Sequence, residues 1–300
     1  MSSDGLAKDM MQKGKDFIVA EEKDLRKLKD FNDKLQYPNI NDQTPIYRYV
    51  SSKTFLSMIE CCTRFNSDSV EGENWLSHIS RWEDPFEGFV FRGRSSVEEV
   101  LNNKENQYSV RNQYQNYFGQ SWTLCEKESD LRWRAYCPNG DGVRIESTVG
   151  RLKKDIMQHS RNLVESACLF SRVFYCEKEI LKNKMKLKGK SKLNYGLGML
   201  FIKSLEFADE FEYRVIVDAS LLREAIMGKK RKESNFRVEN GFLKYNLKRS
   251  GDSGKFALFE NILLDPRMSN MDVERLKSCI SQTGLKCTVK RSVVYDWFDA

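Results

Sequence analysis

The sequence has little of what disordered, exported or membrane-spanning chains require. It contains only five prolines in 300 residues, with 40% hydrophobic and 31% charged residues, and this balance excludes long disordered tracts. The amino-terminal segment holds Lys8, Lys13 and Lys15 but no continuous apolar run of the kind that a secretory signal has. The densest apolar stretch, residues 199–202, is far shorter than the roughly twenty apolar residues of a membrane span. We therefore expect a soluble, cytoplasmic protein that folds throughout and has no membrane partner.

Ligands for a metal ion are scarce and badly spaced. The chain has two histidines, His78 and His159, and its eight cysteines include the adjacent Cys61 and Cys62 but no Cys-x-x-Cys pair. A structural zinc site usually needs cysteines or histidines at such short spacings. Without a secretory signal, the cysteines are expected to stay reduced, several of them as core residues. The sequence therefore predicts no metal cofactor.

The common signatures of nucleotide-binding and hydrolytic enzymes are missing as well. There is no Walker loop, no Gly-x-Gly-x-x-Gly, no zinc-protease helix and no Gly-x-Ser-x-Gly elbow. Fifty basic against forty-three acidic side chains leave a formal net charge of +7. This excess is compatible with an anionic partner such as a nucleotide or a nucleic acid, and equally with ordinary solubility. Composition alone leaves the function open.

The hydrophobic pattern predicts an α+β protein in two parts. Residues 1–40 are expected to form an N-terminal helical extension, with a charged helix from Gly5 to Leu35 that ends before Pro38, and residues 41–300 to form one domain. The extension either docks on the core or grips a partner, and both interpretations stay open. Alternation of apolar and polar residues predicts strands at 46–50, 118–124, 142–146, 167–176, 211–218, 256–264 and near 286–295, and a hairpin from 236–238 and 242–247 that turns at Asn240–Gly241. Helices are expected after Ser51–Ser52 and at 96–117, 149–159, 193–207 and 271–283.

Three polar features lie on the predicted strands. They are Arg48 on the first strand, Ser121 and Thr123 on the second, and Glu210 and Glu212 where a later strand begins. In this order they resemble the arginine–serine–glutamate constellation of ADP-ribosyltransferases, which holds NAD. Because side chains alternate along a strand, the two glutamates are expected on one face. The plainer interpretation is that they are the solvated side of a half-buried strand.

A second resemblance covers the chain from about Pro45 to Tyr295. It is to a family of bacterial proteins known mainly as a domain of unknown function, and it rests on these motifs: Tyr47–Arg48–Tyr49, Glu83–Asp84–Pro85–Phe86–Glu87, Trp133–Arg134–Ala135–Tyr136 with Gly142–Val143, Glu210–Phe211–Glu212–Tyr213–Arg214, and Ile262–Leu263–Leu264–Asp265–Pro266. The chain departs from the family at Glu83 (usually asparagine), at Asp265 (usually glycine) and at Arg134–Ala135. The layout of that family resembles a divergent ADP-ribosyltransferase, which implies a mixed, split β-sheet with peripheral helices.

The resemblance implies a catalytic role for the two glutamates. Glu212 is expected to stabilise the positive charge that develops on the ribose of NAD when the bond to nicotinamide breaks. Glu210 is expected to position or deprotonate the acceptor. NAD is then a substrate, and the residues expected to bind it are Arg48, Tyr47, Ser121, Thr123, Trp133 and Tyr136.

Each binding residue has a specific task in this scheme. Arg48 is expected to contact the pyrophosphate, Ser121 to brace Glu212 or the ribose, and Trp133 or Tyr136 to stack on the nicotinamide ring. The alternative for both aromatics is an ordinary place in the core. Asp84 and Glu87 either brace a loop or belong to a lid over the nucleotide.

Two lysine-rich stretches, Lys178–Lys192 and Lys229–Lys232, lie before and after the strand that carries the glutamates. If they flank one site, the acceptor is a nucleic acid, RNA or DNA with RNA favoured, rather than a protein; if not, they are solvated loops. The sequence therefore favours an NAD-dependent ADP-ribosyltransferase acting on a macromolecule, as a bacterial toxin or anti-phage effector with an antitoxin as a further partner. A nucleic-acid-binding module without chemistry and an NAD hydrolase are the alternatives.

Overall fold

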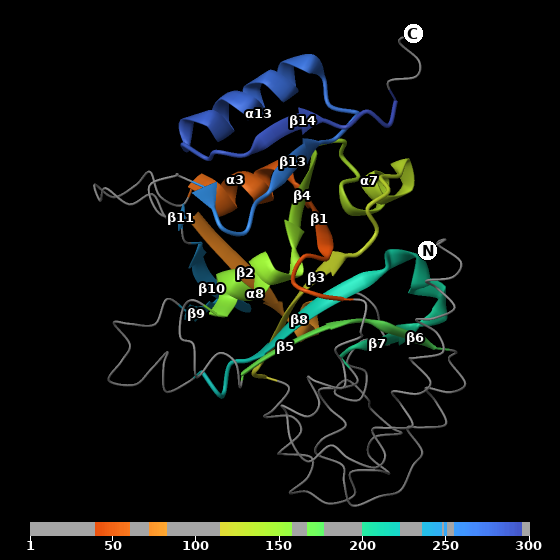
Figure 1. Ribbon diagram of the computed structural model, residues 1–300, viewed down its shortest axis with the longest axis vertical. Helices are drawn as coiled ribbons and strands as arrows, with labels where there is room; N and C mark the ends of the chain where they lie inside the picture. The colour runs from red at the N-terminus through yellow and green to blue at the C-terminus, as the bar shows by residue number, and fades with distance from the viewer. Residues whose placement is uncertain are drawn as a thin grey trace, which may run out of the picture.

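The computed structural model describes residues 40–60, 72–82, 115–157, 167–176, 200–222, 236–247, 249–250 and 255–295. These segments form one large β-sheet with helices packed on both of its faces (Figure 1). Several predictions lie outside the described residues: the helix Gly5–Leu35, the motif Glu83–Glu87, most of the helix at 96–117, and both lysine-rich stretches.

The strands of the large sheet follow the order β14-β13-β4-β1-β3-β2-β10-β9, and β8 and β5 attach through β3. Their bounds are Pro45–Ser51 (β1), Gly72–His78 (β2), Tyr117–Thr123 (β3), Gly142–Thr148 (β4), Cys168–Arg172 (β5), Glu212–Asp218 (β8), Phe236–Glu239 (β9), Phe242–Leu247 (β10), Asn261–Leu264 (β13) and Thr288–Arg291 (β14). β13 and β14 pair in parallel and the other neighbours are antiparallel. The predicted α+β class with a mixed sheet is confirmed.

The sheet divides at β3. One edge of this strand pairs with β8 along its whole length, from Tyr117 to Thr123. The other edge pairs with β2 at Gly119 and with β1 only at Thr123. β1 and β2 therefore leave the same edge as separate branches, one leading to β4 and β13 and the other to β10 and β9, as the expected split sheet requires.

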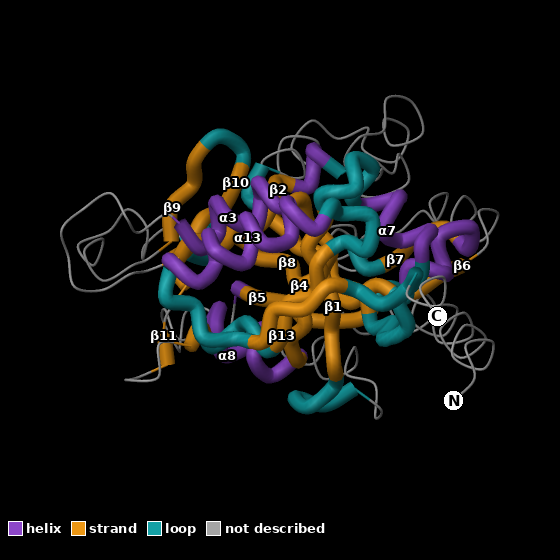
Figure 2. The backbone as a smooth tube through the Cα atoms, turned by 90° about the horizontal axis from the view of Figure 1, so that it is seen from above, coloured by secondary structure: helices purple, strands orange, loops and turns teal. Residues whose placement is uncertain are grey.

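The register gives the sheet two different faces. The core face carries Ile46, Val50, Trp122 and Ile145, which belong to the main hydrophobic cluster. The cluster is closed by apolar residues of α3 (Ser52–Glu60), α8 (Val149–Met157) and α13 (Asn270–Gln282). Figure 2 shows α3 and α13 side by side over the strands. None of the helices among the described segments has the length and apolar character needed to cross a membrane.

Local sequence explains these helices and the hairpin. In α3, Phe55, Met58 and Ile59 lie at helical spacing and are fully buried, and each contributes about 1.5–3 kcal/mol of burial free energy. The Ser269 hydroxyl caps α13 by accepting a hydrogen bond from the Asp272 N–H at 3.1 Å. The β9–β10 turn holds Asn240 and Gly241 at φ values of 50° and 74°, which a type I′ hairpin needs. These predictions are confirmed within a residue or two.

Tertiary pairing overrides the pattern in four places. Residues 202–204, predicted as helical, form β7 (Ile202–Ser204), which pairs with β6 (Phe174–Cys176) in a small second sheet. The predicted strand at 256–264 is divided between β12 (Lys255–Phe256), which pairs with β11 (Arg249–Ser250), and β13. β2 has no counterpart among the predicted strands, and Tyr117 begins a strand instead of ending a helix. Except for β11 and β12, which are neighbours in the sequence, the partner strands come from distant parts of the chain, and local periodicity carries no information about such pairings.

Position 119 requires a glycine because the Trp82 ring packs against it. A Cβ at this position would overlap that ring and lie 2.8 Å from Cδ1 of Ile216. We expect Gly119→Ala to lower the free energy of unfolding by about 1–3 kcal/mol, because a packed site has to shift to admit a methyl group. The measurement is urea denaturation beside Ser121→Ala, an exposed position on the same strand where a change within about 0.5 kcal/mol is expected. Equal losses in the two variants would contradict the packing argument.

Candidate functional site

The second face of the sheet, called the polar face below, brings several predicted site residues into one row. Tyr47 is the register partner of Thr123, and Thr123 is the partner of Glu212. Directly paired residues project to the same side of a sheet, and neighbouring strands lie about 4.8 Å apart, so this row spans about 10 Å. Arg144 and Glu146 of β4 and Ser121 of β3 project from the same face.

Glu212 is a buried carboxylate, with 4% of the residue exposed. Arg214, two residues along the strand, donates from Nε to Glu212 Oε1 at 2.7 Å and from Nη2 to Oε2 at 2.7 Å. The Arg214 guanidinium lies 4.3 Å from the centre of the Trp82 ring. Strand alternation places the acid and the base on one side, and this bidentate pair fixes the direction of the carboxylate.

Lys203 of β7 joins the second glutamate to the first. Its ammonium lies 2.7 Å from Glu210 Oε2 and 3.6 Å from Glu212 Oε2. The ring of Phe207 lies 4.6 Å from the same ammonium. The two carboxylates therefore meet at one cation, as the predicted shared site requires.

The reason for this convergence differs from the prediction. Glu210 does not belong to β8 but ends the 3-10 helix η2 (Leu205–Glu210), and Phe211 follows in the left-handed region at φ 48°. Strand alternation therefore cannot align the two glutamates, and the expectation was wrong on this point. The Thr123 hydroxyl donates to the Glu210 carbonyl at 2.6 Å and fixes this bend, while Ser121 is exposed beside Arg214.

Arg48, expected to contact the pyrophosphate, lies on the core face of the sheet, opposite to the face that carries Glu212. It neighbours Tyr47, whose side chain takes the opposite face, and its register partner is Ile145. Its Nη1 is buried without a hydrogen-bond partner among the described residues. Burial lowers the pKa of the guanidinium to about 10, and the nearby Tyr245 opposes that effect.

A chain of buried polar groups occupies the core face near Arg48. The hydrogen bonds run from Trp122 Nε1 to Gln120 Oε1 at 2.8 Å, from Gln120 Nε2 to Asn74 Oδ1 at 2.9 Å, and from Asn74 Nδ2 to Tyr245 Oη at 2.7 Å. Tyr245 then donates to Asp155 Oδ2 at 2.9 Å. This chain ties β3 to the branch of β2 and β10, because Gln120 on β3 also donates to the Trp75 carbonyl on β2 at 2.8 Å.

Unlike Arg48, Arg144 of β4 lies on the polar face. It is 2% exposed, lies 4.0 Å from the centre of the Tyr47 ring, and forms ion pairs with Glu128 at 3.5 Å and Glu146 at 3.3 Å. Its Nε is buried without a hydrogen-bond partner in the described part of the chain. No motif singled out Arg144: alternation puts Arg144 and Glu146 on one face of their strand, but only the pairing of β4 with β1 places them beside Tyr47.

The helix α7 (Asp130–Tyr136) sets two aromatic rings over β1 from the polar side. Trp133 is fully buried, meets Tyr49 edge-on at 4.8 Å and donates from Nε1 to Glu128 at 3.2 Å. Tyr136 stacks on Tyr49 at 5.8 Å and remains 46% exposed. Burial, followed by the carboxylates of Glu210 and Glu212, raises the pKa of the Tyr136 phenol. Of the two predicted ring clamps, Trp133 is a core residue and Tyr136 is available to a ligand.

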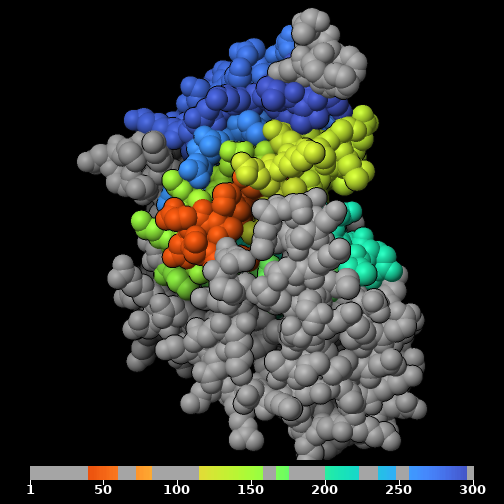
Figure 3. Space-filling model, turned by 45° about the vertical axis from the view of Figure 1, so that its right-hand side comes forward, coloured from red at the N-terminus to blue at the C-terminus, as the bar shows by residue number. Residues whose placement is uncertain are grey.

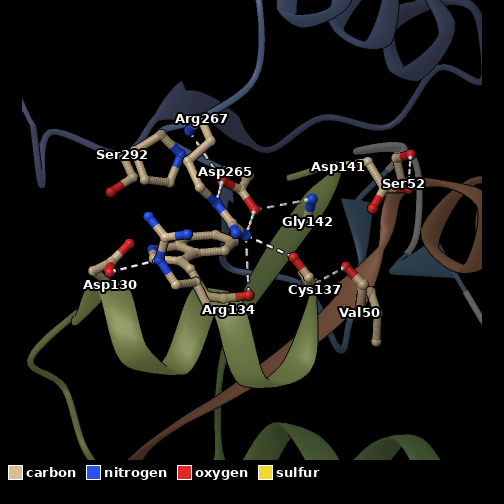
Figure 4. A network of polar contacts seen from close by, with 12 residues as sticks. Val50, Ser52, Asp130, Arg134, Cys137, Asp141, Gly142, Asp265, Arg267 and Ser292 are labelled. Carbon is tan, nitrogen blue, oxygen red and sulfur yellow. Dashed lines mark hydrogen bonds and ion pairs between the residues drawn. The ribbon is translucent and has the colours of Figure 1, made fainter. Parts of the chain in front are cut away.

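An ion pair from the C-terminal part of the chain holds α7 in place (Figure 4). Arg267 pairs with the fully buried Asp265 at 2.7 Å and donates from Nη2 to the carbonyls of Trp133 at 3.1 Å and Cys137 at 2.6 Å. Asp265 also accepts from the Gly142 N–H at 3.3 Å. In Figure 3 the yellow surface of α7 lies above the teal surface of residues 200–222 on one side of the molecule.

The described residues contain no group of three or more histidine, cysteine, aspartate or glutamate residues that could hold a metal ion. A cavity of about 580 Å³ lies between α3, α13 and the turn at 139–141, where Ser52, Asp141, Arg267 and Arg275 line it with apolar residues. None of the predicted site residues lines this cavity, so it is separate from the polar face.

Comparison with known proteins gives three results. A family model described as a protein of unknown function, DUF2971, matches residues 132–215, the segment that carries Trp133, Tyr136, Arg144, Glu210 and Glu212. No curated protein matches.

Two of the similar solved structures are of Thermus sp. 2.9 DarT. One is in complex with ADP-ribosylated ssDNA, with 11% identity, a TM-score of 0.35, and coverage of 87% of this chain and 99% of that chain. The other is in complex with NAD+, with 12% identity, a TM-score of 0.35, and coverage of 86% and 99%. At this level of likeness, the chemistry of the polar face has to carry any functional conclusion.

The two tyrosines of β1 make the stability of the fold depend on pH. Burial raises the pKa of Tyr47 and Tyr49 from 10.0 to about 12 each. The pKa of these two phenols is higher in the folded than in the unfolded chain. Their contribution to the free energy of unfolding is therefore complete below pH 10 and is lost as the pH rises towards 12. We expect tyrosinate absorbance in the native protein to lag behind that of the urea-unfolded chain in this window, and the free energy of unfolding to fall.

Tyr47→Phe is the matched control, because it removes one buried phenol and keeps the ring beside Arg144. The fall in unfolding free energy should be smaller in this variant. Coincident native and unfolded absorbance titrations would show that neither phenol is held neutral by the fold.

Proposed function

We propose that this protein is an NAD-dependent ADP-ribosyltransferase whose substrate site is the polar face. The observation that carries the proposal is the convergence of Glu210 and Glu212 on Lys203, at 2.7 and 3.6 Å, within the electrostatic range of the exposed Tyr136 ring. Two carboxylates with one cation between them supply both charges that glycosyl transfer needs: one for the ribose and one for the acceptor.

Glu212 is proposed to stabilise the ribose cation. Breaking the bond from nicotinamide to ribose leaves positive charge on the sugar, and a fixed carboxylate lowers the barrier to that state. A carboxylate accepts in about four directions; Arg214 takes two and Lys203 approaches a third, so one is left for a ribose hydroxyl. The exposed Ser121 hydroxyl lies next to this pair and is proposed to brace the ribose.

The remaining contacts to NAD follow from the same face. Tyr136 is proposed to stack on the nicotinamide ring, since its own ring is half exposed and already backed by Tyr49. Arg144 is proposed to take the part expected of Arg48, with its unpartnered Nε as the donor towards the pyrophosphate. Tyr47 lies against Arg144 and holds it in this direction.

Glu210 is proposed to meet the acceptor, because 30% of its side chain is exposed while Glu212 is closed in. The acceptor is proposed to be a macromolecule, with RNA favoured on the grounds of the lysine-rich stretches in the sequence. A role as a bacterial toxin or anti-phage effector, countered by an antitoxin, belongs to the same proposal.

The direct experiment incubates the protein with labelled NAD and cell lysate and follows the label. Label in RNA, DNA or protein supports a transferase and identifies the acceptor. Release of free ADP-ribose alone would favour an NAD hydrolase. If NAD stays intact in the lysate and with purified RNA, DNA and protein, the proposed function is wrong.

Glu212→Gln is expected to lower NAD-dependent turnover by about a hundredfold or more, because the amide has no charge to offer the ribose cation. It also leaves Arg214 partly unpaired in a buried place, so the variant should lose about 3–5 kcal/mol of stability. Turnover has to be measured at a temperature where circular dichroism shows the variant folded. Glu239→Gln, on the exposed end of β9, is the control with ordinary turnover. Undiminished turnover of folded Glu212→Gln would remove Glu212 from the mechanism.

A second pair of variants distinguishes the roles of Arg144 and Arg48. Arg144→Lys is expected to weaken NAD binding about tenfold, since an ammonium cannot reproduce the guanidinium fork. Arg48→Lys is expected to leave NAD affinity nearly unchanged, because the register turns Arg48 to the core face. Calorimetric titration with NAD measures both. The opposite order of affinities would return Arg48 to the site.

A further inference from the structure

Lys203 is the one described cation that contacts both candidate glutamates while belonging to neither of their elements. It comes from β7 of the small sheet, and 9% of its side chain is exposed. Two carboxylates at one site repel each other, and one of them takes up a proton unless a cation lies between them. The distances of 2.7 Å to Glu210 and 3.6 Å to Glu212 place the Lys203 ammonium in that position.

Within the part of the chain that the structure describes, the other charged groups near the two glutamates have different contacts. Arg214 of β8 is committed to Glu212. Arg132 of α7 donates to the carbonyls of Lys127 and Asp209, and neither of these hydrogen bonds reaches a glutamate side chain. The phenols of Tyr136 and Tyr175 face the same carboxylates, and burial raises the pKa of both, so they stay neutral.

We propose that Lys203 is a positioning residue that holds Glu210 ionised and directed at the acceptor. The proposal rests on the function proposed above and adds a residue that no motif indicated. In the transfer step the acceptor's O–H or N–H gives its proton to Glu210 while the acceptor atom bonds to the anomeric ribose carbon. The carbon–nitrogen bond breaks, and its electron pair leaves with nicotinamide, which neutralises the positive ring. Lys203 stays protonated throughout and compensates the charge of whichever glutamate is ionised.

The test uses three variants of the full chain. Lys203→Met removes the cation, Lys203→Arg keeps it, and Lys244→Met is the matched control. Lys244 also bridges two carboxylates, Glu73 at 3.4 Å and Glu239 at 2.9 Å, but on the branch of the sheet that leads from β2 to β10 and β9. Thermal melting of each variant establishes that it is folded.

The activity readout is the pH dependence of NAD turnover. A carboxylate that loses its cationic neighbour is protonated more readily, so in Lys203→Met the acid limb of the profile should move up by about one pH unit or more. Lys203→Arg and Lys244→Met should keep the limb of the parent protein. An unmoved limb in folded Lys203→Met would overturn the proposal.

A second readout does not need activity. With glutamate carboxyl carbons labelled, the Glu210 signal is assigned by its loss in Glu210→Gln and is titrated by NMR in each variant. A shift of its midpoint to higher pH in Lys203→Met, and in neither other variant, supports the positioning role even if the labelled-NAD experiment finds no reaction. An identical midpoint in the parent and in Lys203→Met would show that Lys203 does not govern Glu210, whatever the reaction of the protein is.

Discussion

A carboxylate stays ionised inside a protein only where cations and hydrogen-bond donors lie against it, and the polar face is arranged round one such group. Glu212 is 4% exposed and is held by Arg214 from its own strand and Lys203 from another sheet. The surrounding features follow from this constraint. Trp82 covers the outer side of Arg214, Gly119 leaves room for that ring, and Glu210 shares the lysine.

The division of the sheet at β3 decides which side chains can act together. β1 meets β3 only at the Tyr47–Thr123 pair, and that single contact places Tyr47 and Glu212 on one face. Because side chains alternate, the same contact turns Arg48 to the other face, where it lies in the core near Tyr245. Besides Arg214 beside Glu212, the polar face carries Arg144, contributed by β4 on the far side of β1.

Asp265 and Arg267, in the C-terminal part of the chain, influence the site indirectly. Asp265, where the resembled family usually has glycine, is fully buried and fixes Arg267, and Arg267 binds the carbonyls at the end of α7. This departure from the family pattern therefore has a structural consequence: an ion pair that sets the position of Tyr136 over Tyr49. Polar side chains that touch no ligand can still determine where an aromatic ring is presented.

The sequence by itself determined the α+β class, the helices α3, α8 and α13, and the hairpin at Asn240–Gly241, because side-chain periodicity and turn chemistry are local properties. It also singled out Glu212, Glu210 and Tyr136, which the structure brings together. The face on which Arg48 lies, the strands β2 and β7, and the parts taken by Arg144 and Lys203 were decided by tertiary structure alone. Their positions depend on which distant strands pair and in what register, and a shift of one residue in register would turn every side chain of a strand to the opposite face.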